Sequence, residues 1–229
     1  MSRILFVLTS HRILGETGKP TGVWLEELAA PYWLLRDRGH SVTLASIAGG
    51  EVPIDPGSLG TDADRPAAVT RFLGDAQAMA AVRATAAVGT FAVADFDALF
   101  LPGGHGTMWD LPGSAELAAL VGQAFDAGRV IAAVCHGPAG LVAARRADGK
   151  PVVSGLRLTS FTDEEEAAVG LTDVVPFALE TRLRALGASF AGAPKFTAHA
   201  VRDGRLITGQ NPASSEAVAE AIDQALAPR

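Results

Sequence analysis

The sequence predicts an α/β fold of the flavodoxin-like type, a parallel-sheet sandwich with helices on both faces. Short, continuously apolar segments alternate along the chain with amphipathic segments of helical length. Alternation of this kind builds a parallel sheet whose strands are covered on both sides. No linker-like segment or internal repeat divides the 229 residues. We therefore expect a single domain spanning residues 1–229.

In the first half of the chain, apolar runs predict strands and apolar residues at helical spacing predict helices. Pro31 should end or kink the first helix partway, and Ser114 is a suitable N-cap for the third. The glycine- and proline-rich residues 49–66 should form a long ordered loop. The predicted strands are residues 3–9, 41–46, 98–101 and 130–134, and the predicted helices are residues 23–38, 66–85 and 114–127.

The second half continues the alternation. Asn211 is a good N-cap for the last helix, with Pro212 at its first position. Ligands of such folds bind beyond the carboxyl ends of strands, so functional residues are expected in the loops after Thr9, Leu101 and Val134. The predicted elements are a strand at residues 156–161, a helix beginning at Thr162, a helix at 175–186, strands near 199–202 and 206–208, and a helix at 212–226.

The composition excludes several classes of protein. With 48% hydrophobic residues, the chain is not mainly disordered, and its single cysteine excludes a disulfide framework or a zinc site of several thiolates. A net charge of −6 without a cluster of Lys or Arg argues against a nucleic-acid partner. The apolar runs are too short for a membrane span, and the run at residues 4–8 is too short for a signal-peptide core. We expect a cytoplasmic protein with neither membrane nor nucleic acid as partner.

Cys135 lies where the strand at residues 130–134 runs directly into His136-Gly137-Pro138. This pattern is typical of a nucleophile elbow, a strained strand-to-helix turn that exposes one side chain above a sheet. The start of the new helix should lower the thiol pKa, and the His136 amide could hold a developing oxyanion. A free cysteine is also commonly a small buried hydrophobe, and the local pattern leaves both interpretations open.

Two further segments follow the same logic. The glycine-rich run that ends in His105-Gly106 lets the backbone approach a ligand, and the Gly104 amide could form the other half of an oxyanion hole. It lacks a P-loop or dinucleotide fingerprint, so we predict no phosphate site. Glu26 and Glu27 point about 100° apart on a helix, and the spacing of Glu27 from Trp24 favours the inner side. A buried carboxylate has a raised pKa suited to acid–base work, although both residues could simply serve the helix dipole.

An acidic run follows Thr162. Thr162 and Glu165 form a capping box. Glu166 lies one position beyond the box, and on local grounds alone a solvated helix face is the expectation for it.

Taken together, these segments resemble the ThiJ/PfpI branch of the class I glutamine amidotransferase-like superfamily. Within it, they are most similar to the group of heat-shock chaperones and glutathione-independent glyoxalases (glyoxalase III). The resemblance covers the chain almost end to end, in family order. It is carried by Thr21-Gly22-Val23-Trp24 with Glu27 and Pro31, residues 97–106 (DALFLPGGHG), residues 133–138 (AVCHGP), Phe161-Thr162-Asp163 with the acidic run, and residues 208–214 (TGQNPAS).

The resemblance implies a role for each site residue. Cys135 is the nucleophile, His136 the general acid/base, and Glu27 the carboxylate beside the thiol. Glu166 is the third member of the triad by its spacing from Phe161, although a shift of one or two residues would put Glu165 or Glu164 there instead. Gly104, His105 and His136 bind the oxyanion or substrate.

The implied reaction converts a 2-oxoaldehyde such as methylglyoxal into the 2-hydroxy acid, lactate, with no cofactor and no metal. A homodimer is also implied. Two alternatives stay open: another cysteine-dependent hydrolase (a protein deglycase, peptidase or amidohydrolase), and a non-enzymatic stress chaperone or redox sensor.

Overall fold

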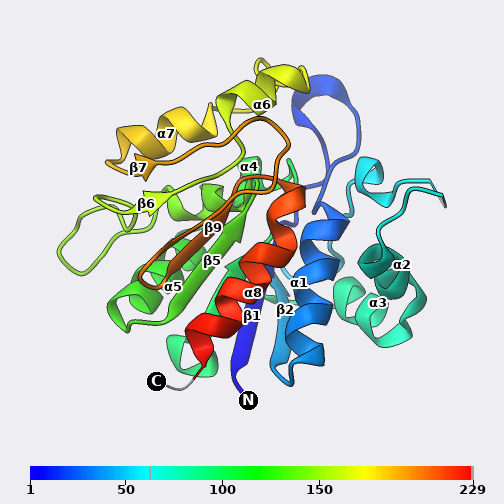
Figure 1. Cartoon of the computed structure of the whole chain (residues 1–229), viewed down its shortest axis with the longest axis horizontal. Coiled ribbons are helices and arrows are strands. Elements are labelled where there is room, and N and C mark those ends of the chain that lie inside the picture. The colour runs from blue at the N-terminus through cyan, green and yellow to red at the C-terminus, as the bar shows by residue number, and fades with distance from the viewer. Residues whose placement is uncertain (62, 228–229) are drawn as a thin grey trace.

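The computed structural model describes residues 1–61 and 63–227 and confirms the predicted fold class. A seven-stranded sheet has the order β3-β2-β1-β4-β5-β9-β8, and only β8 runs antiparallel to its neighbour (Figure 1). Its strands are β1 (Arg3–Leu8), β2 (Ser41–Ser46), β3 (Ala86–Ala87), β4 (Ala98–Leu101), β5 (Val130–Val134), β8 (Ala200–Asp203) and β9 (Leu206–Gly209). A separate pair joins β6 (Arg157–Leu158) to β7 (Ser189–Phe190).

Helices cover both faces of the main sheet because successive strand residues point to opposite sides. In β1, Ile4, Phe6 and Leu8 pack in one apolar cluster, and Leu5 and Val7 pack in another. The first cluster is completed by α1 (Leu25–Asp37), α2 (Ala67–Gly74), α3 (Ala76–Arg83) and α8 (Ser215–Leu226). The second is completed by α4 (Thr107–Asp110), α5 (Ala115–Asp126) and α7 (Leu179–Ala185).

Strand ends place the site residues side by side. Leu101 pairs with Ala133 and Val134 with Gly209, so the segments after β4, β5 and β9 emerge together at the carboxyl edge of the sheet. The short helix α6 (Asp163–Ala168) lies over this edge (Figure 1). The position expected for ligands of a parallel α/β sheet is thus the position where the predicted site residues gather.

Several element boundaries differ from the sequence predictions for tertiary reasons. Helix α1 continues through Pro31, which is itself buried between core residues of the same helix. The helix expected at residues 66–85 divides at Asp75, whose carboxylate accepts from the Ala78 amide and caps α3. The helix expected at 175–186 begins only at Leu179.

The strand expected at residues 156–161 is reduced to β6, because the residues after it turn toward the site. The Thr159 amide donates to the Thr208 hydroxyl at 2.8 Å, and the Phe161 amide donates to the Cys135 carbonyl at 2.8 Å. The capping predictions are confirmed for Ser114, which accepts from the Leu117 amide, and for the Thr162–Glu165 box.

Among the helices within residues 1–61 and 63–227, none combines the length and the apolar character needed to cross a bilayer.

Candidate active site

Cys135 occupies a strained turn at the end of β5. Its φ angle of 58° lies in the left-handed region that non-glycine residues rarely adopt. Two hydrogen bonds hold this conformation: the Cys135 amide donates to the Gly209 carbonyl at 2.9 Å, and its carbonyl accepts from the Phe161 amide at 2.8 Å. Strain of this kind costs about 1–3 kcal/mol and persists where surrounding contacts over-determine the backbone. The predicted elbow is therefore present.

The helix expected after the elbow is only a five-residue 3-10 turn, Gly137–Leu141. The predicted lowering of the thiol pKa is wrong. Burial, followed by the charge of Glu27 and its hydrogen bond to the sulfur, raises the pKa of Cys135 well above its usual value, and the His136 amide only partly opposes this. A turn this short cannot supply the dipole of a full helix.

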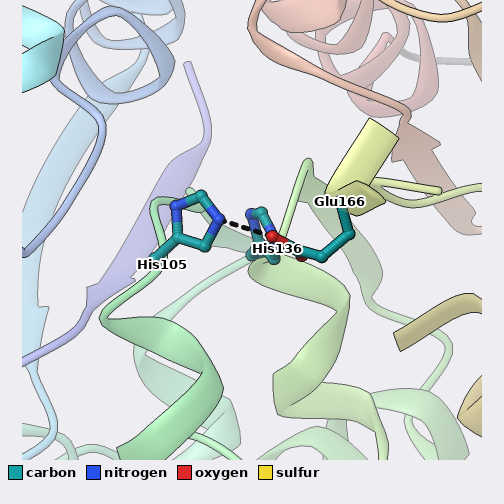
Figure 2. Close-up of side chains that lie close together, drawn as sticks. All are labelled: His105, His136 and Glu166. Atoms are coloured by element: carbon teal, nitrogen blue, oxygen red, sulfur yellow. Dashed lines mark hydrogen bonds and ion pairs between the residues drawn. The ribbon is translucent and has the colours of Figure 1, made fainter. Parts of the chain in front are cut away.

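His136 connects the sulfur to a buried carboxylate. Its Nδ1 lies 3.2 Å from Cys135 Sγ, and its Nε2 lies 2.7 Å from Glu166 Oε2. The other Glu166 oxygen lies 2.9 Å from His105 Nε2, so one carboxylate bridges two histidines (Figure 2). The rings of these histidines are 4.2 Å apart. Among the three adjacent glutamates, Glu166 is the one that contacts His136, and it is buried rather than solvated.

The charges of this cluster follow from its surroundings. Burial lowers the pKa of His136 to about 4, so the ring is neutral at neutral pH. Burial alone would raise the pKa of Glu166, but the hydrogen bonds from His105 and His136 outweigh it and lower the pKa to about 2. An ionised carboxylate only accepts, so each histidine donates its Nε2–H to Glu166. His136 Nδ1 is then a free acceptor facing the thiol.

Glu27 provides a second, uncharged carboxyl group. It is fully buried at the start of α1, whereas Glu26 beside it is partly exposed, as the spacing predicts. The Gly103 amide donates to Glu27 Oε2 at 2.7 Å. Burial raises the pKa of Glu27 to about 8, against the lowering effects of the Cys135 thiol and the Gly103 amide. Oε1 has no hydrogen-bond partner of regular geometry among the described residues, and the carboxyl group lies beside the Cys135 thiol.

The glycine-rich loop after β4 fits only without side chains. A Cβ on Gly103 would lie 2.6 Å from Glu27 Oε2 and 2.7 Å from the His136 amide nitrogen. Gly104 has a φ of +99°, and a Cβ there would lie 2.3 Å from the Gly22 carbonyl oxygen. Close approach thus requires glycine at both positions. It brings Gly104 and His105 to the pocket that contains Cys135, as the sequence predicts.

That pocket has a volume of about 210 Å³. Sequence reasoning found its polar end and missed most of its apolar wall, in particular Phe196 and Val169. It assigned Glu165 a capping role and kept it as an alternative to Glu166 in the triad. In the structure Glu165 Oε1 additionally accepts from the Phe196 amide and the Asn211 side chain, at 2.7 and 2.8 Å. The pocket is lined by Trp24, Gly104, His105, Cys135, His136, Phe161, Val169, Phe196 and Pro212.

The same histidine–carboxylate cluster is the one set of described residues with metal-ligand spacing. Ligand atoms of His105, His136 and Glu166 lie within 4.8 Å of one another, and two histidines with one carboxylate can bind a divalent transition metal. The hydrogen bonds already use the Nε2 atoms of both rings and both carboxylate oxygens, so a metal would have to displace them. The expectation of no metal stays a prediction.

Comparison with known proteins places this geometry in a family. The family model described as DJ-1/PfpI matches residues 20–224. The chain belongs to the DJ-1/PfpI family. Among curated relatives, "Glyoxalase 3" of Candida albicans is 29% identical, with 97% of each chain covered. "Glutathione-independent glyoxalase HSP31" of Saccharomyces cerevisiae is 30% identical, with 95% of this chain and 94% of the relative covered.

Solved structures of this DJ-1/PfpI chain's relatives agree with its fold. The Rapid Encystment Protein 24 kDa of Francisella tularensis matches with a TM-score of 0.95 at 36% identity, over 100% of both chains. Glyoxalase III of Candida albicans matches with a TM-score of 0.89 at 29% identity, over 97% of this chain and 96% of that one.

Proposed function

We propose that this DJ-1/PfpI protein is a glutathione-independent glyoxalase that converts methylglyoxal-type 2-oxoaldehydes to 2-hydroxy acids, without a cofactor. The observation that carries the proposal is the contact chain from Cys135 through His136 to Glu166, with protonated Glu27 beside the same sulfur. Its relatives named as glutathione-independent glyoxalases support the reaction type.

In the first step the Cys135 sulfur attacks the aldehyde carbon. His136 Nδ1 takes the thiol proton as the S–C bond forms, which avoids a free thiolate in a site where burial disfavours one. The aldehyde oxygen, next to Gly104 and the His136 amide, receives the developing charge and then the proton, giving a hemithioacetal. Glu166 stabilises the transient imidazolium, as the acidic member of such triads does.

In the second step a proton moves between the two carbons. Glu27 is suited to this because its pKa of about 8 is close to neutral pH and Oε1 has no regular hydrogen bond. The ionised fraction of Glu27 removes the hydrogen from the former aldehyde carbon, the electrons pass to the ketone oxygen, and the proton of the neighbouring hydroxyl moves to that oxygen, giving an enediolate. Return of the proton to the second carbon gives a thioester carrying a 2-hydroxyl group.

In the last step water adds to the thioester as His136 Nδ1 takes one of its protons, and the Cys135 sulfur leaves with that proton. The sum is addition of one water to the 2-oxoaldehyde, with the aldehyde carbon oxidised and the ketone carbon reduced, so no external oxidant or reductant is needed. With methylglyoxal the product is lactate. A homodimer, implied by the resemblance, and a cytoplasmic location, expected from the composition, belong to the same proposal.

The test is incubation with methylglyoxal in the absence of glutathione, with lactate measured. Cys135→Ala should abolish the product, and Glu27→Gln should remove most turnover. Glu26→Gln is the matched control because Glu26 is the partly exposed neighbour of Glu27 on the same helix. Turnover that persists in Cys135→Ala contradicts the nucleophile assignment. Protection of an aggregating client protein that survives in this variant, with no lactate from the wild type, favours the chaperone alternative.

A further inference from the structure

The candidate active-site pocket is polar at one end only. His105, Cys135, His136 and the Gly104 backbone form its inner end, and every other lining residue has an apolar or aromatic side chain. Phe196 is 50% exposed and Val169 43%, and they are two of the four large hydrophobic side chains exposed among the described residues. Single exposed hydrophobic residues are ordinary on a surface. Two of them beside a reactive thiol indicate a surface that contacts a ligand.

The backbone of Phe196 is held in position for this contact. Its φ of 59° lies in the left-handed region, which is rare for a bulky aromatic residue. The buried Glu165 carboxylate fixes the turn by accepting from the Phe196 amide at 2.7 Å. Asn211 donates to the same Glu165 oxygen and to the Thr197 carbonyl, each at 2.8 Å, so both sides of the turn are tied down. The Phe196 backbone is therefore held in place beside the pocket by the fold.

Aromatic rings run without interruption from His136 to this rim. The Phe161 ring lies 4.5 Å from the His136 ring, at an interplanar angle of 34°. The Phe196 ring lies 6.3 Å from Phe161, at 48°. Centroid separations in this range are those at which aromatic rings attract one another. A planar substituent on a substrate bound at Cys135 would contact the Phe161 and Phe196 rings between the thiol and the solvent.

We infer that the pocket is built for 2-oxoaldehydes with an aryl substituent, and that Phe196 is a specificity-determining residue. The inference rests on the proposed function and names its substrate class. The oxoaldehyde end lies at Cys135 and His136, and the substituent lies against Phe161 and Phe196. A methyl group in the same orientation stays near the thiol and leaves the rim unused.

The first experiment compares kcat/KM for phenylglyoxal and methylglyoxal. The wild type should prefer phenylglyoxal by about tenfold or more, the equivalent of one or two aromatic contacts. Phe196→Ala should lower kcat/KM for phenylglyoxal by about tenfold, through KM, and change methylglyoxal less than about twofold. Phe196→Leu should be intermediate. Ile13→Ala is the matched control, since Ile13 is 42% exposed but does not line the pocket.

Equal preference for the two substrates, or an equal loss for both in Phe196→Ala, would overturn the inference. The substitution alters an exposed side chain, so failure to fold is not expected, and circular dichroism checks this directly.

A second experiment separates this inference from the proposed function. N-phenylmaleimide and N-methylmaleimide alkylate thiols without turnover, and the chain contains one cysteine, so labelling reports Cys135 alone. Rates are divided by those of free glutathione to remove intrinsic reactivity. A phenyl preference that Phe196→Ala abolishes supports the aryl pocket, and if lactate is absent at the same time, only the proposed function fails. Lactate formation with no phenyl preference in either experiment overturns the pocket inference and leaves the glyoxalase proposal standing.

Discussion

The imidazole of His136 and the carboxylate of Glu166 meet at 2.7 Å, and both side chains are buried. Because Glu166 is ionised and can only accept, it fixes the proton of His136 on Nε2. The free lone pair on Nδ1 is thereby directed at the Cys135 sulfur, 3.2 Å away. One contact deep in the site therefore determines which atom of the ring can take the thiol proton.

Replacing Glu166 by Gln tests that relationship. The amide oxygen can accept from one histidine only, and its NH₂ group opposes the N–H of the other, so the tautomer of His136 is no longer fixed. We expect kcat/KM to fall by about a hundredfold or more, in the range typical of general acid–base groups. Glu164→Gln is the control, because Glu164 lies on the same short helix with a side chain 70% exposed and pairs with Lys195. Similar losses in both variants would show that helix α6 was disturbed rather than the tautomer.

The pH dependence of turnover should reflect the neutral histidine. Protonation of His136 removes the acceptor for the thiol proton, and burial lowers its pKa to about 4. Because turnover also needs ionised Glu27, whose pKa is about 8, kcat/KM should fall below pH 8, and the further break due to His136 should lie near pH 4 instead of near 6.5, the ordinary value for histidine. A break near 6.5 in protein that circular dichroism shows to be folded would contradict the assignment of His136 as the base.

The lowered pKa values of His136 and Glu166 also affect the stability of the fold. The pKa of His136 and that of Glu166 are both depressed in the folded protein, so the unfolded chain binds more protons as the pH falls. For His136 the free energy of unfolding is unaffected above pH 6.5 and decreases as the pH falls toward 4. For Glu166 the stabilisation is complete above pH 4.5 and is lost as the pH falls toward 2. Because the raised pKa of Glu27 acts in the opposite sense between pH 4.5 and 8, the net decline in stability on acidification should appear in denaturant melts below about pH 4.5.

Glu27 should act in the opposite sense. Its pKa rises from 4.5 to about 8 on folding, so the folded protein binds the extra proton and stability falls as the pH rises through that interval. In Glu27→Gln the amide oxygen can still accept from Gly103 and no charge is buried. The variant should match the wild type near pH 4.5 and exceed it at pH 7 by on the order of 2–3 kcal/mol.

Denaturant melts between pH 4.5 and 8 measure this difference, with Glu164→Gln as the exposed control. A Glu27→Gln variant that is less stable than the wild type at pH 7 would show that the buried carboxyl stabilises the fold. In that case Glu27 would not be a group that lowers stability at neutral pH in exchange for a pKa suited to catalysis.

Features set by contacts between residues close in sequence could be predicted, whereas features set by contacts between distant residues could not. The strands Ala98–Leu101 and Val130–Val134 were predicted with the correct bounds, because strands covered on both faces are continuously apolar. The Thr162–Glu165 capping box is equally local and was also found. That box sets the rotation of α6 and leaves the next residue, Glu166, directed at His136. Only the spatial position of His136 decides among the three adjacent glutamates.

The features that were missed depend on distant contacts. Phe196 adopts its positive φ because Glu165 and Asn211 hold the turn, and neither residue is close to it in sequence. The raised pKa of Cys135 arises from burial and from Glu27, which a helix-dipole argument based on neighbouring residues does not include. Local patterns thus located the reactive group, whereas its ionisation and the substrate end of the pocket required the packed structure.

Gly103 offers a final test of how tightly the site is packed. A Cβ at this position would lie 2.6 Å from Glu27 Oε2, 2.7 Å from the His136 amide nitrogen and 2.7 Å from the Val134 carbonyl oxygen. Two of these three atoms belong to the backbone, so the contacts cannot be relieved by a side-chain rotation. Gly103→Ala should therefore lower the free energy of unfolding by about 1–3 kcal/mol and displace Glu27 from the thiol. Lactate formation should then fall by more than the loss of folded protein accounts for. Gly113→Ala is the matched control: its Cβ would meet only the Asp110 carbonyl oxygen, at 3.9 Å. If lactate formation in Gly103→Ala equals that of Gly113→Ala, the Gly103–Glu27 contact does not position the proton carrier.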